Sequence, residues 1–238
     1  MSKKILVTND DGINAEGIIK LTETAGRFGE VWVIAPDGQR SAASHSLSCN
    51  LPVSIKSCDF PVAGVHAFAC SGTPADAVRI GILKVMDEKP DYVMAGINNG
   101  YNISHDIQYS ATVGAALEGA FFGIPSIAFS QGALDKTEVV DEYLMSVMEE
   151  CMNMDAGQSN VWNINFPACS LKEFKGILRD RKVSFDPFYD DDYIEEKKPD
   201  GSVLYSIVQH RNWKGSEGTD LAAIIDNYIS IGVVSNVR

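Results

Sequence analysis

Two adjacent carboxylates, Asp10 and Asp11, follow a short apolar segment near the beginning of the sequence. If that segment is a buried strand, the two charges repel each other and lose hydration at its end. A hard divalent cation removes this repulsion, because Mg²⁺ and Mn²⁺ prefer oxygen ligands. Asp-Asp-Gly is also an ordinary turn sequence, and Asp11 could simply cap the next helix. The two residues alone therefore leave a metal site and a turn as equal alternatives.

Two further polar segments follow apolar runs. In the predicted loop 37–50, Ser41 could offer an oxygen to a metal and His45 could assist proton transfer. The same composition also fits a flexible surface loop. The turn-rich segment 96–105 contains Asn98-Asn99-Gly100, whose backbone N–H groups could hold a phosphate or form a plain turn.

Other polar residues give weaker signals. Ser110 lies at the predicted start of a helix, where an anion is favoured, but simple capping by its hydroxyl is the better interpretation. His66, His105 and His210 have no comparable setting, so we expect them to be structural or exposed. The run Asp190–Asp192 fits a solvated loop better than a metal site.

Alternating strands and helices must position these residues. The sequence predicts strands at 4–8, 30–35, 52–56, 65–69, 91–95, 126–130 and 161–166, and helices at about 18–28, 73–86, 110–122 and 139–154. Gly29 is expected to stop the first helix, and Thr73 to cap the second. This alternation predicts a Rossmann-like three-layer α/β/α core with a mainly parallel sheet. Ligands in such sheets bind beyond the carboxyl ends of the strands, where the polar segments lie.

The pattern changes after about residue 175. Aromatic and acidic residues mix over 185–196, a strand-like run returns at 203–209, and 221–231 fits a helix that leads into a strand. We therefore predict a catalytic core over 1–175. Residues 176–238 should form a C-terminal extension of hairpins and arms, partly packed on the core and used in oligomer contacts.

Composition narrows the range of partners. The net charge of −12 would repel a polyanion, so long DNA or RNA is not expected as a partner. A small phosphorylated metabolite is compatible, because a metal can supply local positive charge. Five cysteines without a Cys-x-x-Cys pair indicate reduced thiols in a cytoplasmic protein. We expect neither a signal peptide nor a membrane span.

Several motifs occur together in a specific order. They are Thr8-Asn9-Asp10-Asp11-Gly12, Ala35-Pro36-Asp37 followed by Arg40-Ser41, Ser71-Gly72-Thr73-Pro74, Gly96-Ile97-Asn98-Asn99-Gly100-Tyr101-Asn102 and Tyr109-Ser110-Ala111-Thr112-Val113. This combination resembles the survival-protein-E (SurE) family of 5′/3′-nucleotidases. The resemblance is strong over residues 3–130 and weaker through 163–167 and 219–221. Ala111 departs from the family's usual Gly, and Asp226-Asn227-Tyr228 replaces the more usual Gly before Tyr.

The resemblance implies a metal-dependent phosphomonoesterase that converts nucleoside 5′-monophosphates to nucleoside and phosphate, with 3′-monophosphates as a second candidate class. It implies one divalent cation per subunit, Mg²⁺ or Mn²⁺, held by Asp10, Asp11, Ser41 and Asn98. Asp10 and Asp11 would be the catalytic residues. We expect the substrate and its phosphate to contact Asn9, His45, Asn102, Ser110 and Thr112. The resemblance also implies a homodimer or homotetramer with exchanged C-terminal arms.

Other functions stay open at this point. The same fold could serve as a non-catalytic nucleotide-binding module. A phosphatase could also act through an aspartyl-phosphate intermediate, but haloacid-dehalogenase phosphatases use Asp-x-Asp and these aspartates are adjacent. A nicotinamide-dependent oxidoreductase is a weaker alternative, because the segment after the first strand lacks Gly-x-Gly-x-x-Gly.

Overall fold

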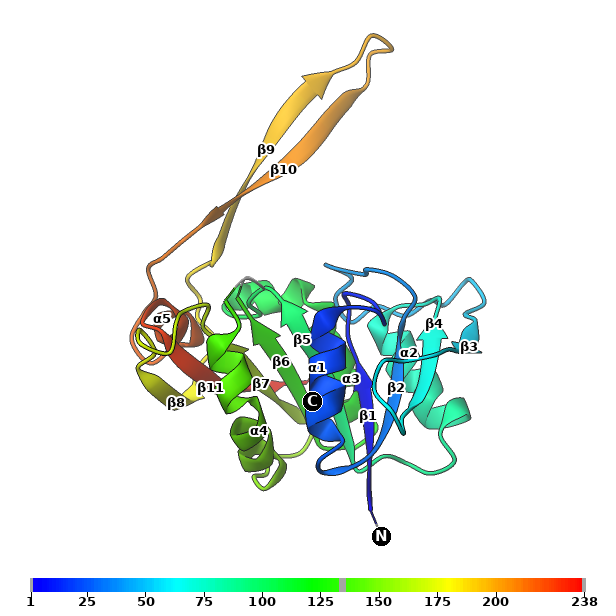
Figure 1. Cartoon of the computed structure of the whole chain (residues 1–238). Coiled ribbons are helices and arrows are strands. Elements are labelled where there is room, and N and C mark those ends of the chain that lie inside the picture. The colour runs from blue at the N-terminus through cyan, green and yellow to red at the C-terminus, as the bar shows by residue number, and fades with distance from the viewer. Residues whose placement is uncertain (1, 133–135, 237–238) are drawn as a thin grey trace.

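Strand β1 (Lys3–Thr8) is apolar on both faces and lies inside the sheet. Ile5 and Val7 join an apolar cluster on one face, and Leu6 joins a second cluster on the other. In the computed structural model, which describes residues 2–132 and 136–236, helices cover both of these faces (Figure 1). Burial on two faces is typical of a parallel strand between helical layers. The predicted three-layer α/β fold is therefore confirmed.

Within the described part of the chain, the main sheet has nine strands in the order β3-β4-β2-β1-β5-β6-β7-β11-β8. The remaining strands of this sheet are β2 (Gly29–Pro36), β3 (Ile55–Ser57), β4 (His66–Cys70), β5 (Tyr92–Asn99), β6 (Ser126–Gln131), β7 (Asn160–Phe166), β8 (Gly176–Arg181) and β11 (Tyr228–Ser235). Most neighbours pair in parallel, whereas β3 with β4 and β11 with β7 pair antiparallel. The sheet is mainly parallel, as predicted.

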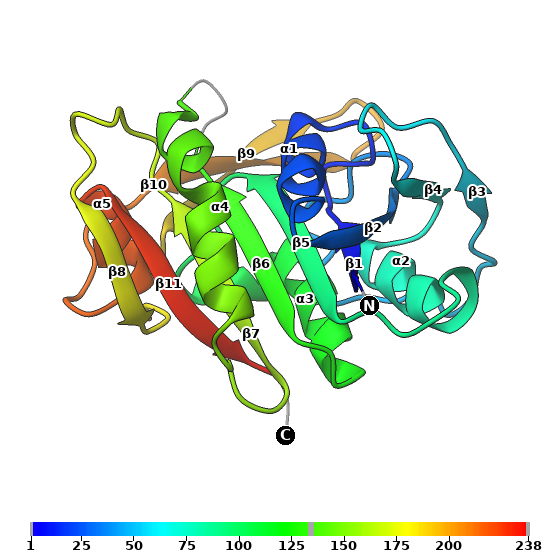
Figure 2. The ribbon, with the colours of Figure 1, turned by 60° about the horizontal axis from the view of Figure 1, so that its bottom comes forward.

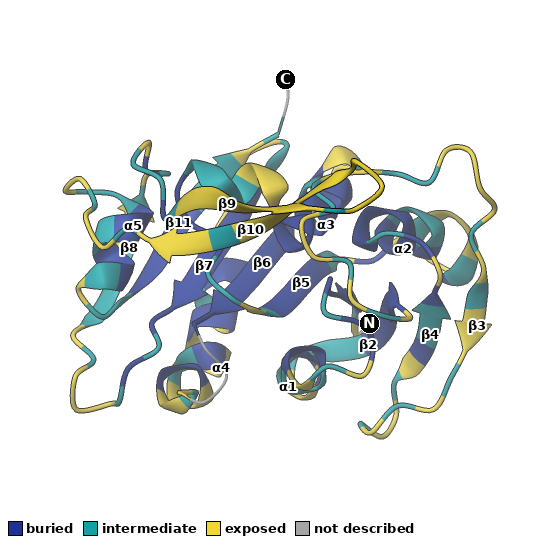
Figure 3. Cartoon of the chain, turned by 90° about the horizontal axis from the view of Figure 1, so that it is seen from above, coloured by how far each residue is buried: buried dark blue, intermediate teal, exposed yellow. Residues whose placement is uncertain are grey.

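The helices divide between the two faces of the sheet. Helices α1 (Glu16–Ala25) and α4 (Glu138–Met152) pack on one face, and α2 (Pro74–Ile80) and α3 (Ala111–Phe121) pack on the other (Figures 2 and 3). The short helix α5 (Asp220–Ile225) precedes and contacts β11. Within the described residues, no helix has both the length and the apolar character to cross a bilayer.

The strand order reverses between β1 and β5. From β1 the chain continues to β2 on one side, and β5 begins the series β5, β6 and β7 on the other side. Ligands in open parallel sheets bind at such a reversal, because the loops separate there and leave a crevice. The loop after β1, the end of β5 and the helix that follows β5 all meet at this point.

A separate antiparallel hairpin, β9 (Tyr189–Lys197) and β10 (Val203–Arg211), projects from the core (Figure 1). Most of its residues are exposed, as the burial colours of Figure 3 show. Asp190–Asp192 are exposed as predicted, but they lie in β9 rather than in a loop, because they pair with β10. The hairpin fits the predicted arm, and its part in oligomer contacts stays a prediction. The division at residue 175 also stays a prediction, although β8 and β11 lie in the main sheet.

Some predicted boundaries are wrong. Helix α1 ends at Ala25 with Gly26 as its C-cap, so Gly29 begins β2 rather than stopping the helix. The predicted helix over 73–86 is α2 followed by a π-helical segment, η1 (Gly81–Val85). Strand β5 continues to Asn99, because its last residues pair with β6, and this converts part of the predicted turn 96–105 into strand.

Gly17 provides a test of the contact between α1 and the end of β5. A Cβ atom at Gly17 would lie 2.0 Å from the carbonyl oxygen of Ile97, so the helix or the strand would have to move. We expect Gly17→Ala to lower the free energy of unfolding by about 2 kcal/mol, as overpacking does elsewhere, measured by urea unfolding. The matched control is Gly26→Ala at the exposed end of α1, where a Cβ atom would lie 3.4 Å from its nearest neighbour. Equal losses in the two variants would contradict this account.

Candidate active site

Asp10 and Asp11 lie directly after β1, where the strand order reverses. Asp10 is 4% exposed, and its Oδ1 accepts a hydrogen bond from the Thr112 hydroxyl at 2.7 Å. Asp11 is half-buried, and its Oδ2 accepts a hydrogen bond from the backbone N–H of Asn99 at 3.1 Å. The first carboxylate is therefore fixed by α3 and the second by the end of β5.

The two carboxylates have no cationic side chain as a partner within the described residues. Burial raises the pKa of Asp10 to about 6; the Thr112 hydroxyl opposes this rise, and the neighbouring Asp11 adds to it. Burial also raises the pKa of Asp11. No Lys or Arg among the described residues forms an ion pair with either of them. Buried carboxylates in this state favour a bound proton or cation.

Asp10 lines a cavity of about 550 Å³. Ser41 from the loop after β2, Asn98 from the end of β5 and Ser110 from the start of α3 line the same cavity. Segments that are far apart in the sequence thus converge on one carboxylate. This is the crevice that the strand reversal predicts.

The predicted metal ligands suit a divalent cation by their chemistry. Asp10, Ser41 and Asn98 share the cavity, and Asp11 is adjacent to Asp10. The Asn98 amide nitrogen donates to the Gly100 carbonyl at 2.9 Å, and this leaves Oδ1 as the free end of the side chain. The described residues contain no cluster of three or more His, Cys, Asp or Glu side chains suited to a metal. A cation here would depend on two carboxylates together with a neutral hydroxyl and an amide, all of them hard oxygen ligands.

The residues predicted to contact the phosphate differ in whether their polar groups are already bonded within the protein. Ser110 caps α3, because its Oγ accepts the backbone N–H of Val113 at 3.0 Å. Asn102 lines the cavity, but its side-chain amide donates to the Ser130 hydroxyl at 2.7 Å. Asn9 is buried with its amide bonded to Gly12, and its Oδ1 has no partner among the described residues. The structure therefore joins Thr112 to Asp10 by a hydrogen bond and places Ser110 and Asn102 in the same cavity lining as Asp10. Asn9 adjoins Asp10 in the chain.

The loop after β5 does not offer the row of free N–H groups that the sequence suggested. The backbone N–H of Asn99 donates to Asp11, that of Gly100 donates to the Gln131 carbonyl, and that of Asn102 donates to Asn165. These donors are occupied, so they cannot cradle a phosphate in this arrangement. The N-terminus of α3 is a candidate anion site because the positive end of the helix dipole lies there, although the Val113 N–H is bound by the Ser110 hydroxyl.

His45 is not among the residues that line the cavity. Its Nε2 is 2.7 Å from Oε2 of Glu118, and Nε of Arg79 is 2.6 Å from Oε1 of the same carboxylate. Burial alone would raise the pKa of Glu118, but the hydrogen bonds from His45 and Arg79 hold it below its usual value. This cluster ties the loop that carries Ser41 to α3. Sequence reasoning missed Glu118 and Arg79, because each stands alone in an otherwise ordinary helix.

The segments 163–167 and 219–221, where the family resemblance is weaker, support the loop between β5 and α3. The Asn165 side chain accepts the Asn102 N–H at 2.8 Å and donates to the Asn102 carbonyl at 3.0 Å. The buried Asp220 accepts the backbone N–H of Ser104 at 3.0 Å. The loop between β5 and α3 is therefore held by β7 and by the start of α5.

Sequence reasoning also missed the hairpin's contribution to the cavity. The cavity is lined on that side by Tyr189, Asp191, Tyr193, Ile207 and Gln209. The alternation of a strand indicates which residues share a face, but nothing in the sequence indicates which face turns toward Asp10. No sequence signal could have found these residues.

Comparisons with known proteins identify the family to which the chain belongs. A family model described as "Survival protein SurE" matches residues 5–184. The 5′-nucleotidase SurE of Clostridium botulinum (strain Loch Maree / Type A3) is 37% identical over 231 residues, which cover 95% of this chain and 90% of that protein. The 5′-nucleotidase SurE of Alkaliphilus metalliredigens is 36% identical over 236 residues, with 96% and 91% covered. The crystal structure of the SurE protein from Aquifex aeolicus superposes with a TM-score of 0.82 at 32% identity, covering 99% of this chain and 94% of that chain.

The Glu118 cluster predicts a stability difference that depends on pH. The carboxylate is 3% exposed, so Glu118→Gln should lower the free energy of unfolding at pH 7 by about 2 kcal/mol, as loss of charged hydrogen bonds does. Because the pKa of Glu118 is lower in the folded protein, its stabilisation is present above its usual pKa of 4.5 and is lost as pH falls through the folded value. Urea unfolding of wild type and variant should therefore show a deficit that narrows below pH 4.5.

The control for Glu118→Gln is Asp141→Asn, which removes an ion pair with Lys20 at a carboxylate that is 50% exposed. Its effect at pH 7 should stay below about 1 kcal/mol, because exposed pairs contribute little. A deficit for Glu118→Gln no larger than that of the control, or one that grows in acid, would show that the cluster does not stabilise the loop.

Proposed function

Because this chain belongs to the SurE family, we propose that it is a metal-dependent 5′-nucleotidase, which hydrolyses nucleoside 5′-monophosphates to a nucleoside and phosphate. The observation that carries the proposal is the pair of carboxylates at the strand reversal, Asp10 buried and Asp11 half-buried. They have no cationic partner among the described residues, and they adjoin a cavity lined by other oxygen ligands. Nucleoside 3′-monophosphates are a second candidate substrate class.

The proposed cofactor is one Mg²⁺ or Mn²⁺ per subunit, with Asp10, Asp11, Ser41 and Asn98 as its ligands. When bound, such a cation supplies positive charge and Lewis acidity at the phosphate ester. The support for this assignment is the ligand chemistry of the site and the uncompensated charge of the two aspartates.

The chain's own groups would act on the phosphate and on water. In the proposed reaction, water attacks phosphorus, the ester P–O bond breaks, and the nucleoside oxygen leaves with a proton. Asp10 or Asp11 accepts the proton that the attacking water loses and gives it to the leaving nucleoside oxygen. The N-terminus of α3, capped by Ser110, stabilises negative charge on the phosphoryl oxygens. Thr112 holds Asp10 in position through its hydroxyl.

The proposal also covers assembly and location. We propose a homodimer or homotetramer that covers the exposed arm, since an isolated two-stranded hairpin is only marginally stable in water. The apolar side chains that such contacts would bury are Ile194, Val203, Leu204 and Tyr205. A cytoplasmic location is supported by the five cysteines, all of which are free thiols. Long nucleic acid is disfavoured by the net charge of −12.

Metal removal tests the proposed function directly. Phosphate release from adenosine 5′-monophosphate should occur with Mg²⁺ or Mn²⁺, stop in EDTA, and return when either ion is added in excess. Full activity in a thoroughly metal-stripped sample would rule out the metal role. Binding of the nucleotide without any phosphate release would instead favour a non-catalytic module.

The two aspartates should not be equivalent, because they are fixed by different elements. Asp10 faces the cavity, so Asp10→Asn should lower kcat ~10²-fold or more at saturating metal, as loss of a positioned acid–base group does. Asp11 is absent from the cavity lining, so Asp11→Asn should mainly weaken metal affinity, and excess Mn²⁺ should restore part of the activity. Equal kcat losses that metal does not restore would show that this division of roles is wrong.

A further inference from the structure

The hairpin turns one of its two faces toward the active-site cavity. In its antiparallel register, Asp191 is opposite Gln209 and Tyr193 is opposite Ile207. Opposite residues share a face, and successive residues along a strand alternate between faces. All four of these residues line the cavity that contains Asp10, together with Tyr189 one step nearer the core. The alternate positions, Asp190, Asp192, Ile194, Val208 and His210, do not line it.

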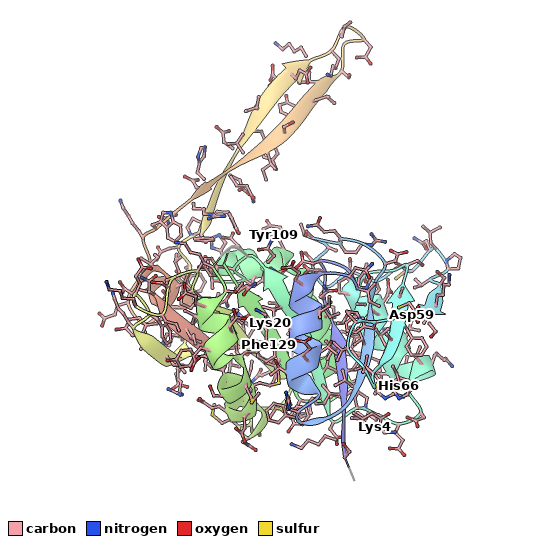
Figure 4. The ribbon with its side chains drawn as sticks, in the orientation of Figure 1. Lys4, Lys20, Asp59, His66, Tyr109 and Phe129 are labelled. Atoms are coloured by element: carbon pink, nitrogen blue, oxygen red, sulfur yellow. The ribbon has the colours of Figure 1, made fainter. Side chains whose placement is uncertain are left out.

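The base of the hairpin is tied to the active-site loop, so this face has a fixed relation to the cavity. The Asp106 carboxylate accepts the backbone N–H groups of Phe188 and Tyr189 at 2.9 and 3.0 Å. Asp106 belongs to η2 (His105–Tyr109), the short helix directly before Ser110 and α3. Figure 4 labels Tyr109 at the upper edge of the core, below the hairpin. The site and the hairpin face are therefore parts of one connected wall.

This wall offers aromatic rings that the protein itself does not cover. Tyr109 is 66% exposed and Tyr193 is 59% exposed, although both line the cavity. Ile207, 51% exposed, adds an aliphatic surface beside Tyr193. Aromatic side chains of this kind stack on planar nucleobases, with little dependence on which base is present.

A polar pair accompanies the rings. The side chains of Asp191 and Gln209 make no hydrogen bond to any other described residue. Glutamine offers both a donor and an acceptor, and an ionised aspartate offers acceptors only. Together they match the hydroxyl and amino donors and the ring acceptors of a nucleoside.

The charge of the wall limits which ligand groups can bind to it. No Lys or Arg is among the residues that line this cavity, whereas Asp106 and Asp191 are. Arg211 shares the hairpin face, but it lines an adjoining cavity of about 240 Å³ beyond Tyr189. A second anionic group next to Asp191 would be repelled, so the wall favours an uncharged group.

We propose that the hairpin face of Asp191, Tyr193, Ile207 and Gln209 is a nucleoside subsite of this active site. Tyr193 and Tyr109 stack on the base, while Asp191 and Gln209 bind the polar edge of the base or the ribose. The subsite rests on the proposed function, because it assumes that the phosphate lies near Asp10. The C-terminal hairpin then selects the substrate's leaving group in addition to any part in assembly.

Substrate selectivity tests the subsite. The probes are adenosine 5′-monophosphate and glycerol phosphate, a phosphate monoester without a planar group. Tyr193→Ala and Gln209→Ala should each lower the ratio of kcat/KM for the nucleotide to that for glycerol phosphate by about tenfold, the loss that removal of one stacking or hydrogen-bonding contact produces. A ratio that is unchanged in both variants would overturn the proposal.

Neighbouring residues on the other hairpin face provide matched controls. Asp190→Ala and His210→Ala change the same two strands at the positions next to Asp191 and Gln209, and they should leave the selectivity ratio unchanged. Light scattering on all four variants checks that the oligomeric state is the same. If the controls lower the ratio as much as Tyr193→Ala and Gln209→Ala do, the effect belongs to the hairpin as a whole, and the subsite is wrong.

A binding measurement separates failure of the subsite from failure of the proposed function. If the wild-type protein releases phosphate from neither probe, the proposed activity is wrong. Calorimetry with adenosine, which carries no phosphate, then decides the subsite by itself. Weaker binding by Tyr193→Ala than by wild type and Asp190→Ala would support the subsite, and equal binding by the three proteins would overturn it.

Discussion

The carboxylate of Asp10 is buried where the end of β1 meets the N-terminus of α3, and no cation of the described chain offsets its charge. Much of the surrounding structure follows from keeping α3 close to this point. The helix is built from small residues, and a Cβ atom at Gly114 would lie 2.6 Å from the Ser44 carbonyl. At Gly119 a Cβ atom would lie 2.7 Å from Cβ of Val93 in β5. Close packing on both sides of α3 therefore fixes the Thr112 hydroxyl that holds Asp10.

The same constraint explains why residues far from the carboxylates support the site. The Ser41 loop is tied to α3 through the Glu118 cluster, and the loop after β5 is tied to β7 and α5 through Asn165 and Asp220. Each tie is a buried or half-buried polar contact between segments from different layers. The C-terminal region thus has two roles in this architecture, because it completes the sheet and also supplies one wall of the cavity.

Local signals in the sequence determined the fold class and the centre of the site. The alternation of apolar strands and helices predicted the three layers, and Thr73 caps α2 as expected. The adjacent Asp10 and Asp11 marked the strand end, because two carboxylates in sequence need a special environment wherever they are buried. Boundaries were less certain, as Gly29 and the segment 96–105 show, since pairing with a neighbouring strand overrides local turn preference.

Only the tertiary structure decided which of the polar residues act together. Ser41 and His45 come from one loop, and the sequence suggested a metal ligand and a proton-transfer group. The structure places the His45 ring against Glu118, while Ser41 lines the cavity. Tyr193 and Gln209 gave no signal, because the face that a hairpin turns toward a distant carboxylate is set by its register and by how its base is anchored. The sequence by itself determined the fold class, the paired aspartates and the family motifs, because these depend on short-range spacing. Which residues line the cavity depends on contacts between segments that are up to more than a hundred residues apart in the sequence, as Thr112 and Asp10 are. Local spacing does not encode such contacts.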